Sequence, residues 1–186
     1  MKEFDYWKIP KFIPDCVCDT LVQSYGNWKQ AIVHNNEVIN SSGKLRESDV
    51  AWITDPFWKT SFFKIMSDIN ELSGLNFNIQ RVENLQLTRY VAPAGHYDFH
   101  MDGNGYTVSK HHDGLTRRLS MSVLLNNRSE FEGGDFMFHI GSKPYTVDMD
   151  KGDIVVFPSY NLHKVSHLTK GTRYSLVVWA IGNPIV

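Results

Sequence analysis

The chain is 186 residues long, which is enough for one domain with a full hydrophobic core and cramped for two. Its composition, with 42% hydrophobic and 13% aromatic residues, is typical of a folded globular protein and excludes disorder driven by charge. The formal net charge of -1 provides no overall attraction to nucleic acid or to an acidic membrane surface.

The N-terminal segment MKEFDYWKIPKFIPD contains early acidic residues and no apolar run of signal-peptide length. No stretch approaches the roughly 20 apolar residues that a membrane helix needs. Cys16 and Cys18 are too close together for an ordinary disulfide, and they have no His or Cys partners at zinc-finger spacing. We therefore expect a cytoplasmic, reducing setting and no membrane partner.

Two helices are predicted in the first 80 residues. A short one begins near Pro14, and a longer one covers DPFWKTSFFKIMSDINELSG, where Asp55 can cap the N-terminus, Pro56 suits the first turn and Gly74 can end the helix. Apolar residues at steps of three and four form one stripe along the longer helix, which we expect to face the core. The members of the stripe are Trp58, Phe62, Ile65, Met66, Ile69 and Leu72.

From about residue 82 the hydrophobic period changes to two, which predicts a series of short strands separated by glycine-containing turns. Such a series favours a mainly β sandwich or jelly roll within an α+β chain, with the helices bracing one sheet and a pocket at the barrel mouth. We expect a single domain over 1–186, with a helical front at 1–80 and a jelly-roll core at 81–186. The predicted strands are 82–91, 96–102, 118–126, 135–140, 144–149, 153–158, 162–168 and 172–181.

The segment HYDFHMD contains His-x-Asp twice, at His96/Asp98 and at His100/Asp102, and a third copy at His111/Asp113 lies in a polar loop. On a regular strand the four residues of HYDFHMD at alternate positions share one face, so either pair can hold a metal. Four ionisable groups on one buried strand face would be costly without a ligand. A solvent-facing edge strand explains the same pattern, and the motif alone does not decide between the two.

A facial iron site needs two imidazoles and one carboxylate, so a third ligand must come from elsewhere. The downstream candidates are His139, His163 and His167. His163 follows a buried strand, and the KGT sequence after it predicts a tight turn that would pair strand 162–168 with strand 172–181. In such a hairpin Arg173 lies beside the histidine strand, whereas His167 is nearer the turn and exposed.

Arg173 begins RYSLVVWAI, which is too apolar for an edge strand. A guanidinium at the start of a buried strand needs an anionic partner, and its fork matches a carboxylate in bidentate fashion. Ser175 lies two residues on and points the same way. The partner is either a ligand or an Asp or Glu of the chain itself.

Four segments together resemble the Fe(II)- and 2-oxoglutarate-dependent dioxygenases of the prolyl 4-hydroxylase-like branch. They are ENLQLTRYVAPAGHYDFHMD, RRLSMSVLLN, FEGGDFMF and KGDIVVFPSYNLHKVSHLTKGTRYSLVVWAIG, with a weaker echo in GKLRESDVAW. The resemblance spans about residues 83–182 and implies a double-stranded β-helix. By this resemblance, His100, Asp102 and His163 are the metal ligands and the catalytic centre, and the residues that bind the cosubstrate are Arg173, Tyr90 and Ser175.

The same resemblance implies Fe(II), 2-oxoglutarate and O2 as cofactor and cosubstrates, and it leaves a requirement for ascorbate open. It implies hydroxylation of a C–H bond with release of succinate and CO2, and favours a prolyl residue in a peptide or protein. Loops 34–50 and 103–117 are the expected places for substrate contacts, with Trp52 and Tyr106 as candidate lining residues.

Three alternatives stay open: a free small-molecule substrate, a nucleic acid base, or a non-catalytic jelly roll that binds a metal and a small acid. The neutral charge argues against the base, although five basic residues could gather locally. They are Lys110, Arg117, Arg118, Lys164 and Lys170.

Overall fold

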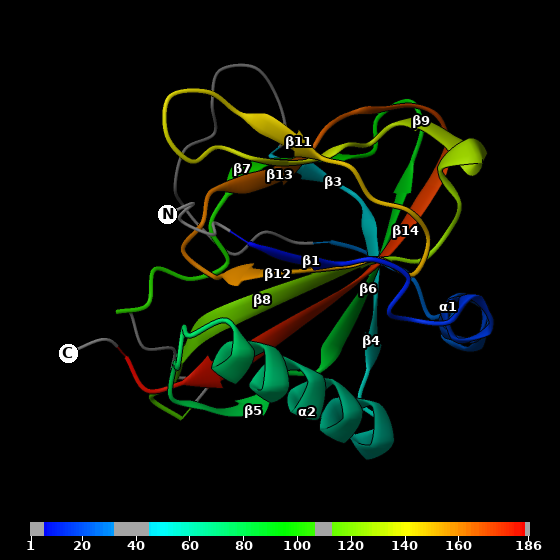
Figure 1. Cartoon of the computed structure of the whole chain (residues 1–186). Coiled ribbons are helices and arrows are strands. Elements are labelled where there is room, and N and C mark those ends of the chain that lie inside the picture. The colour runs from blue at the N-terminus through cyan, green and yellow to red at the C-terminus, as the bar shows by residue number, and fades with distance from the viewer. Residues whose placement is uncertain (1–5, 32–44, 107–112, 185–186) are drawn as a thin grey trace.

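The computed structural model describes residues 6–31, 45–106 and 113–184, and within them two antiparallel sheets face each other (Figure 1). The large sheet has the order β1-β12-β8-β14-β6-β4-β2, with β5 and β9 also paired to β14, and the small sheet has the order β11-β10-β13-β7-β3. The fold is therefore mainly β, as predicted, and it is a double-stranded β-helix or jelly roll. Parts of the predicted loops, including Lys110 and His111, lie outside the described residues.

The large sheet contains nine described strands. They are β1 (Trp7–Ile9), β2 (Lys29–Gln30), β4 (Asp49–Ile53), β5 (Ile79–Val82), β6 (Leu85–Val91), β8 (Thr116–Leu124), β9 (Phe131–Gly133), β12 (Ile154–Pro158) and β14 (Leu168–Gly182). The small sheet comprises β3 (Arg46–Glu47), β7 (His96–His100), β10 (Phe136–Phe138), β11 (Tyr145–Val147) and β13 (His163–Val165). The helices are α1 (Asp15–Ser24), α2 (Pro56–Leu72) and the short 3-10 helix η2 (Arg128–Glu130).

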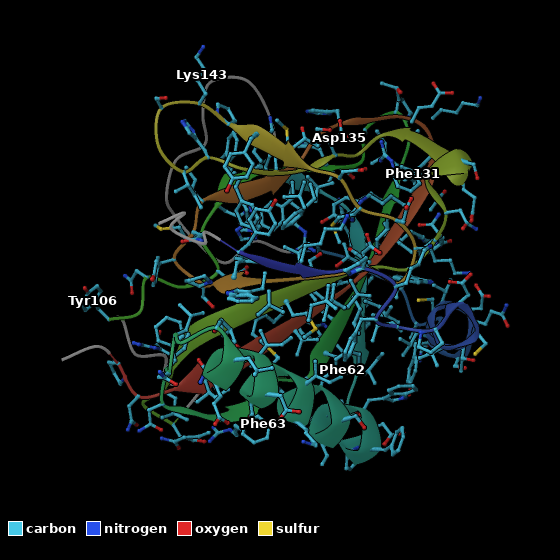
Figure 2. The ribbon with its side chains drawn as sticks, in the orientation of Figure 1. Phe62, Phe63, Tyr106, Phe131, Asp135 and Lys143 are labelled. Carbon is cyan, nitrogen blue, oxygen red and sulfur yellow. The ribbon has the colours of Figure 1, made fainter. Side chains whose placement is uncertain are left out.

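The two faces of the large sheet have different neighbours. We call the face that packs against the helices the outer face, and the face turned toward the small sheet the inner face. The outer-face core joins Phe62 and Met66 of α2 to leucines and valines of β6, β8 and β14, and Figure 2 shows Phe62 projecting from α2 toward this sheet. The inner-face core combines aromatic residues from both sheets, among them Tyr90, Phe138 and Phe157.

Both predicted helices are present. The Asp55 side chain accepts a hydrogen bond from the Phe57 backbone N–H at 2.8 Å, as a capping residue should, and Gly74 follows the helix end with φ of 73°. The placement of Leu72 in the core was wrong, because its side chain is 79% exposed while Leu75 packs against the core instead. Neither α1 nor α2, the longer helices of the described ranges, has the length and hydropathy of a membrane span.

The first 80 residues are not only helical. They also provide β1, which pairs with β12, and β4, which pairs with β6. Residues 1–80 therefore contribute strands to the large sheet. The predicted strand 82–91 is interrupted after Val82 and forms β5 and β6. Short strands of three to five residues carry too little periodicity to be recognised without their partners.

The predicted hairpin across KGT is wrong. β14 runs from Leu168 to Gly182 without a turn, and β13 pairs with β7 and β10 rather than with β14. Gly171 has φ of 74°, and a Cβ at this position would lie 2.0 Å from the Glu130 carbonyl oxygen. The glycine therefore permits close approach of the β9 segment within one long strand, which short-range sequence signals cannot distinguish from a turn.

Candidate functional site

His100, Asp102 and His163 come together at one end of the space between the sheets. His100 ends β7 and His163 begins β13, and the two residues are direct partners in the antiparallel ladder. Asp102 follows β7 in a loop. The backbone N–H of Asp102 donates a hydrogen bond to the Ser159 carbonyl oxygen at 3.0 Å. One ligand atom from each of the three side chains lies within 4.8 Å of the others, so the structure groups the three predicted residues.

The predicted common face of HYDFHMD is wrong. In the ladder with β13, His100 is opposite His163 but Tyr97 is opposite Val165, so three residues of β7 span two of β13. This bulge breaks the alternation. His96 instead stacks on His167 with ring centroids 3.9 Å apart, and Asp98 is exposed.

Both histidines of the cluster are oriented by backbone carbonyls. The Nδ1 atom of His100 lies 2.7 Å from the Asp98 carbonyl oxygen, and that of His163 lies 2.9 Å from the Asn161 carbonyl oxygen. Because a carbonyl can only accept, each Nδ1 carries the proton and each Nε2 presents a lone pair. The two Nε2 atoms are 3.8 and 3.6 Å from Asp102 oxygens, which directs all three groups at one point.

The electrostatics of the cluster favour a neutral His100 imidazole and an ionised Asp102 carboxylate. Burial, reinforced by His163, lowers the pKa of His100 to about 3. Burial alone would raise the pKa of Asp102, but His163, His100 and Arg117 outweigh it and hold the pKa below its usual value. The Asp102 Oδ2 atom is buried and has no hydrogen-bond partner among the described residues. Two imidazoles and a carboxylate with an unsatisfied oxygen are the donor set of a facial Fe(II) site, so these residues fit that metal.

Arg173 lies on the inner face of β14 opposite Tyr90 of β6, and its guanidinium carbon is 5.7 Å from the Tyr90 ring centroid. Its side chain is 2% exposed, and burial lowers its pKa to about 10, so it remains charged at neutral pH. No ion pair of Arg173 is found in the described part of the chain, and its Nη1 atom has no hydrogen-bond partner there. An internal salt bridge therefore does not explain this buried charge, which favours an anionic ligand.

Gly134 covers one side of Arg173. A Cβ at Gly134 would lie 3.1 Å from the Arg173 Cδ atom and 2.7 Å from a Leu168 methyl carbon. A cavity of about 160 Å³ borders Arg173 and contains the Arg128–Asp135 ion pair of 3.0 Å. Its lining includes none of the three clustered residues, so it adjoins Arg173 rather than the candidate metal ligands.

A chain of contacts that the sequence did not reveal runs from His100 through Tyr97 and Arg46 of the small sheet to Gln86 of the large sheet. The Tyr97 ring stacks on His100 at 3.4 Å between centroids, and Arg46 of β3 lies 4.6 Å above Tyr97. Arg46 also donates to Gln86 Oε1 at 3.3 Å and to Ser48 at 2.7 Å. Arg46 and Ser48 belong to GKLRESDVAW, the segment with the weaker family resemblance, but only the pairing of β3 with β7 brings this segment to the three clustered residues.

The remaining candidates occupy other positions. His139 packs against Phe99, and His167 is exposed, so neither belongs to the cluster. Trp52 is 49% exposed with its ring 6.4 Å from that of Trp179, and Tyr106 is 64% exposed at the periphery in Figure 2. Ser175 is buried on the same face as Arg173, as predicted.

Comparison with known proteins agrees with this geometry. A PKHD-type hydroxylase of Alteromonas mediterranea is 32% identical over 83 residues, which is 45% of this chain but 37% of that relative, so the match spans less than half of the relative's length. The viral collagen prolyl hydroxylase of Paramecium Bursaria Chlorella virus-1, in its 2OG complex, is 18% identical and superposes over 97% of both chains with a TM-score of 0.69. A Trichoplax adhaerens prolyl hydroxylase, in complex with a hypoxia inducible factor peptide fragment, is 19% identical. It superposes over 96% of this chain and 84% of that chain with a TM-score of 0.67.

The structural neighbours establish the fold alone, because their identities are low. Residues 85–181, more than half of the chain, match the model of the 2OG-Fe(II) oxygenase superfamily. This segment contains the three clustered residues together with Tyr90, Arg173 and Ser175. The chain therefore belongs to the 2OG-Fe(II) oxygenase superfamily, with the jelly-roll fold of its prolyl 4-hydroxylase-like branch.

Proposed function

We propose that this protein is an Fe(II)- and 2-oxoglutarate-dependent dioxygenase that hydroxylates a prolyl residue in a peptide or protein. The observation that carries the proposal is the presence, between the same two sheets, of a two-histidine, one-carboxylate cluster and of a buried guanidinium that has no ion pair within the described residues. A metal site alone would suit many proteins. The added cation suits a small acid that bridges the metal and Arg173.

In this proposal His100, Asp102 and His163 hold Fe(II), and Arg173 grips the distal carboxylate of 2-oxoglutarate with its planar fork. Tyr90 and Ser175 line the same end of the site. When bound, Fe(II) with 2-oxoglutarate and O2 supplies the oxidant that converts C–H to C–OH, with release of succinate and CO2. The chain orients these groups and excludes water from them, since the clustered residues are largely buried.

A peptide substrate is supported by an exposed aromatic side chain on the large sheet and by the similar solved structures, which include prolyl hydroxylases. Trp52 and Trp179 form an aromatic pair beside Arg117, whose guanidinium lies 3.7 Å from the Trp179 ring centroid. The exposed Trp52 ring suits contact with the compact, apolar ring of a prolyl residue. Trp52 is the exposed member of the pair, at 49%, whereas Trp179 is 6% exposed.

A nucleic acid substrate has less support, because basic side chains near the site are engaged within the protein. Arg117 pairs with Glu83 at 2.6 Å, and Lys170 pairs with Glu132 at 3.1 Å. Arg118 is 8% exposed and donates to the Gly105 carbonyl. These contacts leave little free positive charge for phosphates.

The direct test is to incubate the purified protein with Fe(II), 2-oxoglutarate, O2 and a panel of proline-containing peptides. We expect succinate formation that depends on one of the peptides, and a gain of one oxygen atom in that peptide by mass spectrometry. Succinate formation without any modified peptide would contradict the proposed prolyl substrate but would still support oxygenase activity. Absence of both, with metal and 2-oxoglutarate bound, would show a binding protein instead.

A further inference from the structure

The inner face of the large sheet carries more buried polar side chains than the proposed function uses. On β6, β8 and β14 the outer-face positions are leucines, valines and a methionine, whereas the alternate positions include hydroxyl and amide groups. Buried polar groups are costly unless they are hydrogen-bonded. Their concentration on one face indicates a polar ligand between the sheets. The residues are Gln86, Thr88, Ser120, Ser122 and Ser175, each 5% exposed or less.

One of these groups is unpaired. Within residues 6–31, 45–106 and 113–184, the buried side-chain atoms without a hydrogen-bond partner are Thr88 Oγ1, Asp102 Oδ2, Arg173 Nη1 and Trp179 Nε1. The proposed function assigns a metal to Asp102 and a carboxylate to Arg173. Thr88 is 0% exposed and has no assigned role. An unsatisfied hydroxyl in a central strand would be a cost without a benefit unless a ligand uses it.

The strand register places Thr88 between the two ends of the proposed ligand. Tyr90 is opposite Arg173, and Thr88, two residues away on the same face of β6, is opposite Ser175. Two residues further, Gln86 accepts from Arg46, which lies over Tyr97.

The Tyr97 ring in turn stacks on His100, so the Gln86 end of β6 is linked to the metal ligands. The Tyr90 end of β6 lies beside Arg173. A two-residue step along a strand is about 7 Å, the length scale of a five-carbon diacid. Thr88 therefore lies along the path from the metal ligands to the guanidinium.

We propose that the Thr88 hydroxyl donates a hydrogen bond to a carboxylate oxygen of the 2-oxo diacid and is a cosubstrate-binding residue. This inference rests on the proposed function and adds a residue to it. The hydroxyl of Thr88 on β6 adds a hydrogen-bond donor beside the guanidinium of Arg173 on the neighbouring β14. Together the two groups favour binding of a diacid over a monoacid. A purely structural Thr88 would serve only as a β-branched residue of the sheet, a role that valine fills equally well.

The test compares Thr88→Val, which removes the hydroxyl at nearly constant shape, with Thr88→Ser, which keeps it. The affinity for 2-oxoglutarate is measured without turnover, by titration calorimetry of the Mn(II)-loaded protein and by the ligand-induced rise in Tm. We expect Thr88→Val to bind about ten- to a hundredfold more weakly than the wild type, the effect of losing a hydrogen bond to a charged group. Thr88→Ser should stay within a few-fold of the wild type. Without ligand, Thr88→Val should unfold at a temperature no lower than the wild type, because the hydroxyl has no protein partner to lose.

The outcomes separate the two proposals. If the wild type binds no 2-oxoglutarate in the presence of metal, the proposed function fails. If the wild type and both variants bind with equal affinity, the role of Thr88 fails while the proposed function stands. A Thr88→Val protein that unfolds earlier than the wild type yet binds normally shows a structural hydroxyl and also overturns the inference.

Discussion

The outer and inner faces of the large sheet are built from the same strands but bury different kinds of side chain. On the outer face Leu87, Met121 and Leu176 are fully buried in an apolar core against α2. On the inner face the alternate positions Thr88 and Arg173 are equally buried but polar, with unpaired atoms. Because side chains of a strand alternate between faces, one sheet can place its stability on one side and its ligand contacts on the other.

The largest expected effect comes from the Asp102→Ala variant, which removes the anionic member of the metal cluster. We expect loss of Fe(II) binding and of all turnover, because two neutral imidazoles remain to hold a divalent cation. Metal content after dialysis and succinate formation are the measurements. The apo variant should stay folded, because the Asp102 backbone N–H keeps its hydrogen bond to the Ser159 carbonyl oxygen. Full activity in this variant would remove Asp102 from the site.

The next effect tests the opposite face. Leu176→Ala leaves a cavity in the outer core and should lower the free energy of unfolding by about 2 to 5 kcal/mol, measured by urea denaturation. The folded variant should bind 2-oxoglutarate with wild-type affinity. Ser175→Ala is the matched control from the adjacent position on the inner face, and it should show the reverse pattern. Equal loss of binding in both variants would mean that the two faces are not independent.

The Arg173→Lys variant keeps the positive charge but loses the planar guanidinium group. We expect the 2-oxoglutarate concentration for half-maximal activity to rise about ten- to a hundredfold, because an ammonium cannot bind a carboxylate in bidentate fashion. The rate at saturating 2-oxoglutarate should change less. If the KM for 2-oxoglutarate is unchanged, the distal carboxylate binds elsewhere.

The smallest effect concerns Asp153, a buried carboxylate outside the cluster whose side chain is held by several hydrogen-bond and ion-pair partners. Asp153 accepts hydrogen bonds from the Lys11 and Asp150 backbone N–H groups at 2.8 and 2.9 Å and pairs with Lys8 at 3.1 Å. Burial opposes these contacts, but together they hold the pKa of Asp153 below its usual value. Asp153→Asn should cost about 1 to 2 kcal/mol of unfolding free energy at neutral pH.

The sign of the pH dependence follows from the lowered pKa. The folded state favours the ionised form of Asp153. The contribution of this carboxylate to the free energy of unfolding is therefore complete above the ordinary carboxyl pKa of about 4, and it is lost as the pH falls through the lower pKa of the folded state. The stability difference between the wild type and Asp153→Asn should therefore shrink below about pH 4. Urea denaturation at several pH values measures it, and a difference that grows in acid would contradict this assignment.

Sequence patterns predicted the strand-rich core and both helices because the signals are local. Alternation in RYSLVVWAI, the Asp55-Pro56 start and the Gly74 end each depend on residues close together in the chain. The candidate ligands were also found by local spacing, combined with resemblance to a known family. The KGT hairpin and the common face of HYDFHMD failed because a glycine can serve a close approach and a bulge can shift one strand against another.

The sequence by itself determined that this is a mainly β chain of the 2OG-Fe(II) oxygenase type, and it predicted His100, Asp102, His163 and Arg173 as candidate site residues. Only the tertiary structure decided that His163 comes to His100 as a ladder partner, that Arg173 has no ion pair within the described residues, and that Thr88 is on the same sheet face as Tyr90. The physical reason is that strand order and register are set by contacts between distant segments. Residue spacing within one segment does not contain that information.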